Sequence, residues 1–581
     1  MSADRRPRFA PRRASPGPMG PLLACLAALG LAACDRPGDA ASRAAANPAA
    51  SGIAANAATG TAAIPTTVTG GAVGPPDKRG GVAWRAASSD AQIDAAFADA
   101  RAENKPVFVY WGAKWCPPCN QIQATLFHRQ DFIERTRAFV PVYVDGDSPG
   151  AQKVGARFRV SGYPTLVLFS PQGQELTRLP GEADPGRYTQ LLTLGMNAAR
   201  PVKSVLAEAL AGGTSLTAND WRLLAFYSWD TDERQVVPKD RLPATLARLA
   251  DACPPGQPEV AMRLRLKALA AADAKSPARA DPGVRSSVLA LLAEGPRARE
   301  QTDTLTLYAA EIARALGPSG TPERAALLAA FGQALERLQA DATLSRADRL
   351  QAVIARVDLA RIDTPDGPTK ANAARTVPPP LPAALLADVR EQAARADREI
   401  TDPYERQAVI GSAAWLLERA GLGAESDALL KANLAKSHSP YYLMSGLASN
   451  AKKRGDQAEA LRWYREAFER SEGPSTRLQW GASYLNALTE MTPADEATIE
   501  ATSARLLAEA AAQPDAFYER SARSLQRVGQ RLQTWNQGGA HAGVLSRLQK
   551  KLDEVCAAPA RSAGERATCA GLLAPAAKPG A

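Results

Sequence analysis

Two cysteines, Cys116 and Cys119, lie two residues apart in the stretch Trp-Cys-Pro-Pro-Cys that begins at Trp115. A pair at this spacing can close a small disulfide and open it again, which is the chemistry of dithiol exchange. The apolar run 107–111 precedes the pair, so the cysteines are expected where a strand leads into a helix. The helix dipole and unpaired N–H groups favour the Cys116 thiolate, and Cys119 lies on the same face, where it can attack back.

The two residues between the cysteines are both prolines. Pro117 and Pro118 fit the first turn of a helix but contribute no N–H group. The nearest backbone donor left for the Cys116 thiolate is therefore that of Cys119. This predicts a thiol pKa that is lowered less than in a motif with a single proline.

Two other kinds of site use paired cysteines. A structural disulfide between Cys116 and Cys119 would close too small a loop to stabilise a fold much. A zinc site needs two further ligands, but the three histidines of the chain, His128, His438 and His541, have no partner at ligand spacing. The sequence therefore favours a redox-active disulfide, with no metal or other cofactor.

The residues around the motif predict a small α/β sheet that is covered on both faces by helices. Strands alternate with helices, and a turn at 171–173 joins the last two strands in a hairpin. The predicted helices span 90–103, 116–127, 150–158 and 185–197, and the predicted strands span 107–111, 139–145, 165–169 and 175–179.

This order of elements resembles the thioredoxin superfamily over residues 84–200, so the expected fold class is an α/β thioredoxin fold. The resemblance rests on the Trp-Cys-Pro-Pro-Cys motif, which opens a helix, and on the stretch Gly-Tyr-Pro-Thr at 162–165, which starts a strand. The nearest branch is the carboxy-terminal module of transmembrane thiol:disulfide interchange proteins, whose strand entry is similar to Lys-Pro-Val at 105–107.

The resemblance implies roles for five residues. Cys116 would be the nucleophile that attacks a disulfide, and Cys119 would resolve the mixed disulfide that results. Pro164 would be the family's cis-proline beside the active site, and the backbone of Tyr163 would pair with an extended substrate segment. Trp115 would pack against the fold and also form part of the surface on which a substrate docks.

One position departs from the family pattern. Tyr110 stands six residues before the first cysteine, where many thioredoxins bury an acid that accepts the proton of the second cysteine. Lys114, His128 and Asp145 are candidates to replace that acid. Each of the three also fits an ordinary role as a solvated or packing residue, so the proton acceptor for Cys119 stays open.

The amino terminus predicts a signal peptide at 1–33. Arginines precede an apolar stretch at 21–33 that is too short to cross a membrane. Its end, Leu-Ala-Ala-Cys at 31–34, resembles a bacterial lipobox, which implies cleavage before Cys34 and acylation of that cysteine. An ordinary export signal in which Cys34 is incidental is the alternative.

The residues after Cys34 predict a tether. Asp35 resembles the inner-membrane retention signal of enteric bacteria, but the rule differs between lineages, so either membrane is open. Residues 34–83 are rich in Ala, Gly and Pro and bury too little apolar surface to fold, so a disordered linker is expected. The reach of such a linker is roughly 35 Å. The net charge of +10 over 581 residues is mild, and nucleic-acid binding is not predicted.

Three more cysteines lie in the folded part of the chain, and Cys25 lies in the signal. Cys556 and Cys569 are close enough in sequence to pair, since an exported protein meets an oxidising compartment. Cys253 is then left alone. It is interpreted as a small buried apolar residue rather than a reactive thiol, because nothing nearby in the sequence favours a thiolate.

Beyond residue 200 the strand signals end, and Ala, Leu, Arg and Glu recur at helical spacing. A helical region is predicted over 201–400 and helical repeats over 401–550, with an Ala/Pro-rich tail at 551–581 that is expected to fray. Several prolines at 363–382 predict a loop that divides the helical region.

The repeats have a period of 34, which pairs Gly421 with Gly455 and Pro440 with Pro474. This period resembles tetratricopeptide repeats, with two visible units and a degenerate third at 494–517. Such helix pairs stack into a curved solenoid that often offers a concave surface to peptides or proteins. A scaffold without a binding partner of its own is equally open.

These observations predict a lipid-anchored, periplasm-facing thiol:disulfide oxidoreductase. Its expected partners are protein disulfide or dithiol substrates and a redox partner in the envelope, with the helical region selecting clients or docking that partner. The alternative function is a non-catalytic envelope protein that binds partners through its helical repeats and carries the redox fold as a passive platform. The direction of electron flow is open, because it depends on reduction potentials.

Overall fold

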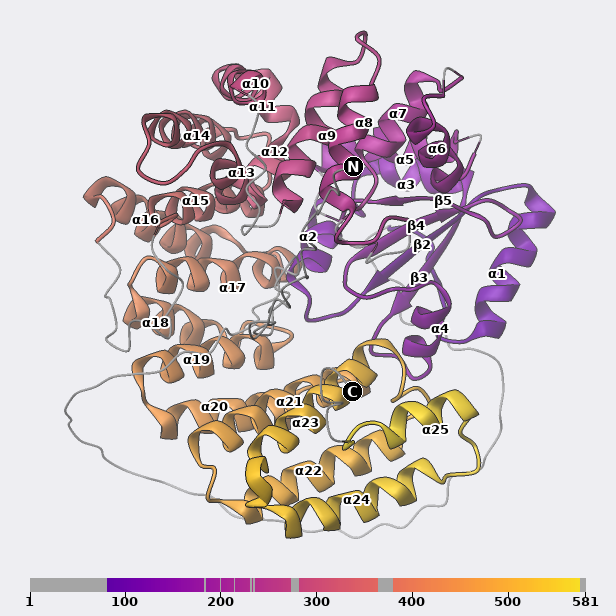
Figure 1. Cartoon of the computed structure of the whole chain (residues 1–581), viewed down its shortest axis with the longest axis vertical. Coiled ribbons are helices and arrows are strands. Elements are labelled where there is room, and N and C mark those ends of the chain that lie inside the picture. Colours follow the sequence, from indigo (N-terminus) through magenta and orange to yellow (C-terminus); the bar gives the residue numbers. More distant parts are fainter. Residues whose placement is uncertain are drawn as a thin grey trace, which may run out of the picture.

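The computed structural model describes residues 81–574 except 182–183, 199, 214, 230–231, 233–235, 273–281 and 364–379. The predicted signal peptide, the anchor Cys34, Asp35 and nearly all of the tether therefore lie outside the described residues, as does most of the proline-rich loop at 363–382. Two bodies of structure follow along the chain, a redox domain and a helical region (Figure 1).

The redox domain contains every element predicted from the sequence, with boundaries that differ by at most two residues. It also contains a short first strand and a helix after α2 that the sequence pattern did not predict. The elements are β1 (Arg85–Ala86), α1 (Asp90–Glu103), β2 (Val107–Gly112), α2 (Pro117–Thr125), α3 (Gln130–Arg135), β3 (Val140–Asp145), α4 (Ala151–Arg157), β4 (Thr165–Phe169), β5 (Glu175–Leu179) and α5 (Pro185–Met196).

The five strands form one mixed sheet in the order β1-β3-β2-β4-β5. β3 runs parallel to both β1 and β2, whereas β4 is antiparallel to β2 and to β5. In the central pair the register places Gly112, the last residue of β2, opposite Asp145, the last residue of β3. The chain leaves β2 at this edge and enters the loop that carries the cysteines.

Alternate side chains of β2 enter two different cores, because successive residues of a strand point to opposite faces. Val107, Val109 and Trp111 belong to the core under α1 and α4. Phe108 and Tyr110 belong to the core under α2 and α5. All five are buried, which explains why β2 reads as an unbroken apolar run and confirms a sheet covered on both faces.

The rest of the described chain is helical. Its helices are α6 (Val202–Leu210), α7 (Ala218–Ala225), α8 (Leu242–Ala252), α9 (Pro258–Ala271), α10 (Pro282–Ala293), α11 (Gly295–Glu300), α12 (Thr302–Leu307), α13 (Ala309–Leu316), α14 (Pro322–Ala340), α15 (Arg346–Ala360), α16 (Ala383–Glu399), α17 (Pro403–Arg419), α18 (Gly423–Asn433), α19 (Pro440–Arg454), α20 (Gln457–Arg470), α21 (Pro474–Met491), α22 (Glu496–Ala511), α23 (Glu519–Trp535), α24 (Ala542–Cys556) and α25 (Ala563–Ala570).

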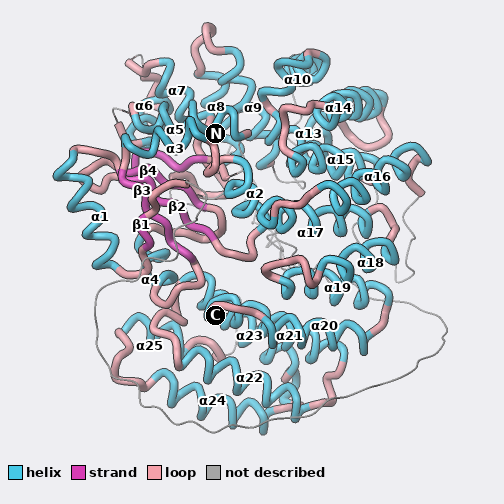
Figure 2. The backbone as a smooth tube through the Cα atoms, turned by 180° about the vertical axis from the view of Figure 1, so that it is seen from behind, coloured by secondary structure: helices cyan, strands magenta, loops and turns pink. Residues whose placement is uncertain are grey.

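The helical region curves around the redox domain. Figure 1 and the reverse view in Figure 2 show α6 to α9 above the sheet, α14 to α19 along one side and α20 to α25 below. The predicted 34-residue period is the spacing of helix starts in its middle part: α18 and α20 begin at Gly423 and Gln457, and α19 and α21 at Pro440 and Pro474. The inner side of this curve faces the redox domain.

The carboxy-terminal residues differ from the expectation of a frayed tail. Residues 563–570 form α25, and the predicted disulfide between Cys556 and Cys569 is present. Leu572 and Leu573 are buried against the helical core. Ser562 and Glu565 cap α25 reciprocally, and this capping box is a local sequence signal for the start of the helix.

No helix among the described residues is long and apolar enough to cross a membrane. Cys253 is partly buried and forms no disulfide. Burial raises the pKa of its thiol to about 11, so it is protonated at neutral pH. This agrees with the interpretation of Cys253 as an unreactive apolar residue.

Candidate functional site

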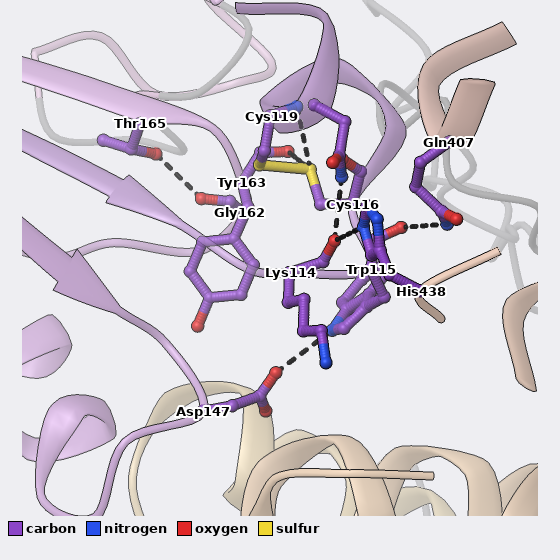
Figure 3. The surroundings of a disulfide bond; sticks show 11 residues. Lys114, Trp115, Cys116, Cys119, Asp147, Gly162, Tyr163, Thr165, Gln407 and His438 are labelled. Atoms are coloured by element: carbon purple, nitrogen blue, oxygen red, sulfur yellow. Dashed lines mark hydrogen bonds between the residues drawn. A yellow bond between two sulfur atoms is a disulfide. The ribbon is translucent and has the colours of Figure 1, made fainter. Parts of the chain in front are cut away.

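The two cysteines lie at the amino end of α2 and are joined in a disulfide (Figure 3). Cys116 is the cap residue of the helix, with extended backbone, and its Sγ accepts a hydrogen bond from the backbone N–H of Cys119 at 3.3 Å. Pro117 and Pro118 occupy the first two helical positions. The backbone N–H of Cys119, which the sequence predicts as the donor to the Cys116 sulfur, is thus the donor in the structure.

A Pro117→Gly variant is expected to have a lower Cys116 thiol pKa than the wild type. The glycine restores one backbone N–H beside the thiolate and so adds a hydrogen-bond donor to the charged form. Thiolate absorbance near 240 nm, followed against pH in the reduced protein, measures the shift. An unchanged or higher pKa in the variant contradicts the idea that the prolines withhold donors.

The loop before β4 lies against the disulfide. The peptide bond between Tyr163 and Pro164 is cis, as the resemblance implies, and the carbonyl oxygen of Tyr163 is 3.6 Å from Sγ of Cys116. The Thr165 hydroxyl donates to the carbonyl of Gly162 at 2.8 Å and fixes the turn. The backbone edge expected to receive a substrate segment is therefore next to the reactive sulfur.

Trp115 is held by groups from both bodies of the protein. Its indole N–H donates to Asp147 at 3.2 Å, and its backbone carbonyl accepts from the side chain of Gln407 in α17 at 3.1 Å. Its ring stacks on Tyr442 of α19, with ring centroids 5.9 Å apart. Only 9% of Trp115 is exposed, so the residue expected to form a docking surface is buried by the helical region.

Asp147 is the centre of a buried polar cluster between the redox domain and the helical region. Its carboxylate accepts from the Thr476 backbone N–H at 2.9 Å, from the Thr476 hydroxyl and from the Arg520 guanidinium at 2.6 Å. The Arg520 guanidinium lies over the rings of Trp115 and Tyr163, 5.1 and 5.3 Å from their centroids. An ion pair that is desolvated on both sides therefore joins α23 to the site.

Two further contacts close the site at Lys114. Its ammonium pairs with Glu472 at 2.9 Å, and its backbone carbonyl is 3.0 Å from Nε2 of His438. With these contacts in place, Cys116 and Cys119 are each only 3% exposed. The disulfide is thus enclosed by helices that lie hundreds of residues further along the chain.

Tyr110 takes the place of the family's acid inside the core. Burial, together with the nearby charge of Asp145, raises the pKa of its hydroxyl far above the usual range, so it stays neutral. Burial and the neighbouring Asp147 raise the pKa of Asp145 to about 6. Among the candidate acceptors, Lys114 is engaged with Glu472, while Asp145 is a carboxyl that changes charge near neutral pH.

An Asp145→Asn variant is expected to be more stable than the wild type at pH 7.5 by about 1–2 kcal/mol. The folded pKa of about 6 lies above that of an unfolded chain, so the native state binds more protons between about pH 4 and pH 6. Stability is therefore lost as the pH rises through this window, and the variant removes that loss. Urea unfolding at pH 4 and pH 7.5 measures the free energy of unfolding of the variant and the wild type.

The matched control is Asp94→Asn, which changes an exposed carboxylate of α1 that is paired with Arg157. It should shift stability by at most about 0.5 kcal/mol at either pH. At pH 4 the advantage of Asp145→Asn should be much smaller, because the carboxyl is then protonated in the folded state and about half protonated in the unfolded chain. Equal destabilisation by Asp145→Asn at both pH values would contradict a raised pKa.

The residues that enclose the site were not identified from the sequence. Gln407, Tyr442, Thr476 and Arg520 show no local motif, and Asp147 reads as an ordinary loop residue after β3. Their roles arise only when the helical region folds against the redox domain. Among the described residues, no group of three or more His, Cys, Asp or Glu side chains is placed to hold a metal ion.

The comparisons with known proteins agree on the redox domain. The family model described as a thioredoxin-like domain matches residues 93–195. The thiol:disulfide interchange protein DsbD 1 of Pseudomonas aeruginosa is 33% identical over 128 residues, 20% of each chain. Thioredoxin of Mycobacterium tuberculosis is 35% identical over 89 residues, 15% of this chain and 72% of that protein.

A solved structure of DsbH oxidoreductase aligns with 23% of this chain and 96% of its own, at 18% identity and a TM-score of 0.18. The chain spans about a fifth of the length of the DsbD relatives that it matches. The similarity reported by these comparisons lies in a small part of the chain, whereas the helical region makes up most of it.

Proposed function

Because this chain belongs to the thioredoxin family through its redox domain, we propose that it is a thiol:disulfide oxidoreductase that exchanges disulfides with proteins through Cys116 and Cys119. The observation that carries the proposal is the cysteine pair itself. It closes a disulfide at the start of α2, with Sγ of Cys116 beside the carbonyl of Tyr163 and its cis-proline. This geometry gives a nucleophile, a resolving thiol and a backbone edge for the substrate.

The reaction transfers two electrons in two steps. The Cys116 thiolate attacks a substrate disulfide, which forms a mixed disulfide and releases one substrate thiolate. Cys119 then loses its proton and attacks Sγ of Cys116, which releases the second substrate thiolate and leaves the disulfide Cys116–Cys119. The substrate is reduced and the pair is oxidised, and a partner dithiol must reduce the pair again. The reverse sequence oxidises a substrate.

Asp145 is the group that we propose accepts the Cys119 proton. It ends β3 opposite the residue that leads from β2 into the cysteine loop. Its raised pKa of about 6 suits an acceptor at neutral pH better than an ordinary carboxylate. In an Asp145→Asn variant, the pH dependence of the resolving step should move upward, and an unchanged pH profile would exclude this role.

The reduction potential of the Cys116–Cys119 pair tests the proposed activity. The protein without residues 1–34 is equilibrated in dithiothreitol or glutathione buffers, and the fraction of reduced pair is measured by alkylation and mass spectrometry. A potential near or below about −220 mV indicates a reductant, and one near about −120 mV indicates an oxidant or isomerase. A pair that never equilibrates supports the alternative, a passive platform on which the helical region binds partners.

The location is proposed from the sequence alone. The Leu-Ala-Ala-Cys stretch at 31–34 supports acylation of Cys34 after signal cleavage, and hence a lipid anchor that faces the periplasm. The substrates and the redox partner would then be envelope proteins. Fractionation of cells that express wild type or Cys34→Ser checks this, since the variant should leave the membrane fraction. A variant that stays in the membrane fraction excludes the anchor.

A further inference from the structure

The helical region occupies the face of the redox domain on which a substrate is expected to dock. Contacts to this face come from α17, α19, α21 and α23, which lie together along the inner side of the curve in Figure 1. Several of these contacts are buried or partly buried hydrogen bonds to named atoms of the site rather than general packing. The face is therefore recognised by the chain's own helices.

The contacts extend to the backbone edge beside the reactive sulfur. Arg523 of α23 donates to the carbonyl of Ser161 at 2.6 Å, two residues before Tyr163. The Gln152 side chain accepts from the backbone N–H of Arg520 at 2.9 Å and donates to the Tyr163 hydroxyl at 2.8 Å. An extended segment that pairs with Tyr163 would have to lie where α23 is packed.

The enclosed state leaves some polar groups unsatisfied. Arg520 is 9% exposed, and its Nε and Nη1 atoms have no hydrogen-bond partner within the described part of the chain. A buried donor without a partner disfavours the state in which it is buried. The enclosure is thus stabilised by the Asp147–Arg520 pair but penalised at the same guanidinium.

We infer that the helical region is an intramolecular cover of the redox site, which must move away before Cys116 can react with a protein disulfide. The inference rests on the proposed function. An attacking sulfur has to reach bonding distance of its target, yet Cys116 is 3% exposed and its neighbour Trp115 is clamped between Gln407 and Tyr442. A folded or extended protein cannot approach the sulfur in this arrangement.

Gly473, the residue before α21, provides the sharpest test. It has a φ of +84°, and a Cβ placed there would lie 2.5 Å from Cβ of Asp147 in the redox domain. The added methyl group of a Gly473→Ala variant therefore clashes with Asp147 and should push the helical region away from the redox domain. Gly320→Ala is the matched control, because Gly320 has a φ of +76° but nothing within 4 Å of a Cβ.

A second variant removes the ion pair instead of adding bulk. Arg520→Gln breaks the contact with Asp147, and Arg477→Gln is its control. Arg477 pairs with Glu509 inside the helical region at 2.7 Å, away from the redox domain. The readout is the rate at which a maleimide carrying a polyethylene glycol chain of 5 kDa (about the size of a small protein domain) alkylates Cys116 in the reduced full chain, located by peptide mapping.

The cover predicts that Gly473→Ala and Arg520→Gln raise the alkylation rate about tenfold or more, equivalent to about 1.4 kcal/mol of lost closed state, while both controls match the wild type. The wild-type rate should also rise at least about a hundredfold in denaturing urea. Circular dichroism before the assay checks that each variant is folded. If either variant is unfolded, the comparison of wild-type alkylation rates with and without urea tests the cover on its own.

Wild-type Cys116 that reacts as fast when folded as in urea overturns the cover, as do folded variants with the wild-type rate. These outcomes are separate from failure of the proposed function. If the proposed function fails, the Cys116–Cys119 pair does not equilibrate with dithiothreitol at all, whatever the alkylation rates are.

Discussion

A Cys119→Ser variant is expected to accumulate covalent complexes between Cys116 and its protein substrates. Cys116 can still attack a disulfide, but the serine hydroxyl cannot release the product, so the reaction stops at the mixed disulfide. Turnover should fall by at least about a thousandfold. Non-reducing electrophoresis followed by mass spectrometry detects the complexes, which should disappear when a reductant is added.

Two cysteine variants serve as controls for this result. Cys116→Ser makes the same chemical change three residues away, but it removes the nucleophile, so it should be equally inactive and form no complexes. Cys253→Ser leaves the pair intact and should behave as the wild type, since the Cys253 thiol is protonated at neutral pH. Complexes that form in Cys116→Ser would show that the roles of the two active-site cysteines are wrongly assigned.

Removing the second disulfide is expected to destabilise the carboxy-terminal helices by up to about 3 kcal/mol. Cys556 and Cys569 are 13 residues apart, and cross-linking a loop of this length lowers the entropy of the opened state. In a Cys556→Ser/Cys569→Ser double variant, the free energy of opening of α24 and α25, measured by amide hydrogen exchange, should therefore be lower than in the wild type. Cys253→Ser again is the control, because Cys253 forms no disulfide.

The effect should reach α23 as well. A Cβ on Gly529 of α23 would lie 1.7 Å from the carbonyl oxygen of Leu572, so the segment after α25 packs directly on that helix. Faster exchange in α23 of the double variant would show that the carboxy terminus supports the helix that carries Arg520. Exchange rates that match the wild type throughout α23, α24 and α25 would mean that the disulfide is dispensable for this packing.

The redox domain could be predicted because its signals are local. The run that forms β2 is apolar throughout since it is buried on both faces, and the two cysteines follow it at a fixed spacing. The cis-proline stands at the start of β4, where the fold requires it. The missed strand β1 has only two residues, Arg85 and Ala86, and both are exposed. Its existence depends on pairing with β3, which no periodicity of its own can reveal.

The environment of the site could not be predicted, because it is made by contacts between distant segments. Gln407 lies in a helical repeat whose pattern explains its helix but not the direction of its side chain. Arg520 reads as one of many arginines, with no local pattern that distinguishes it from the others. The repeat pattern predicts a concave side that meets another protein or no partner at all. In the structure it meets the redox domain of the same chain.

The residues that enclose the site are synthesised long after the residues that they enclose. Gln407 follows Trp115 by 292 residues, and Arg520 follows Asp147 by 373. At ribosomal rates of about 5 to 20 residues per second, Arg520 is made roughly 20 to 75 s after Asp147. Both disulfides join cysteines that are near in sequence, 3 and 13 residues apart, so neither needs the distant helices in order to form. If the chain reaches its oxidising compartment amino end first, the cysteine pair arrives there before the helices that enclose it, and it can form its disulfide while still exposed.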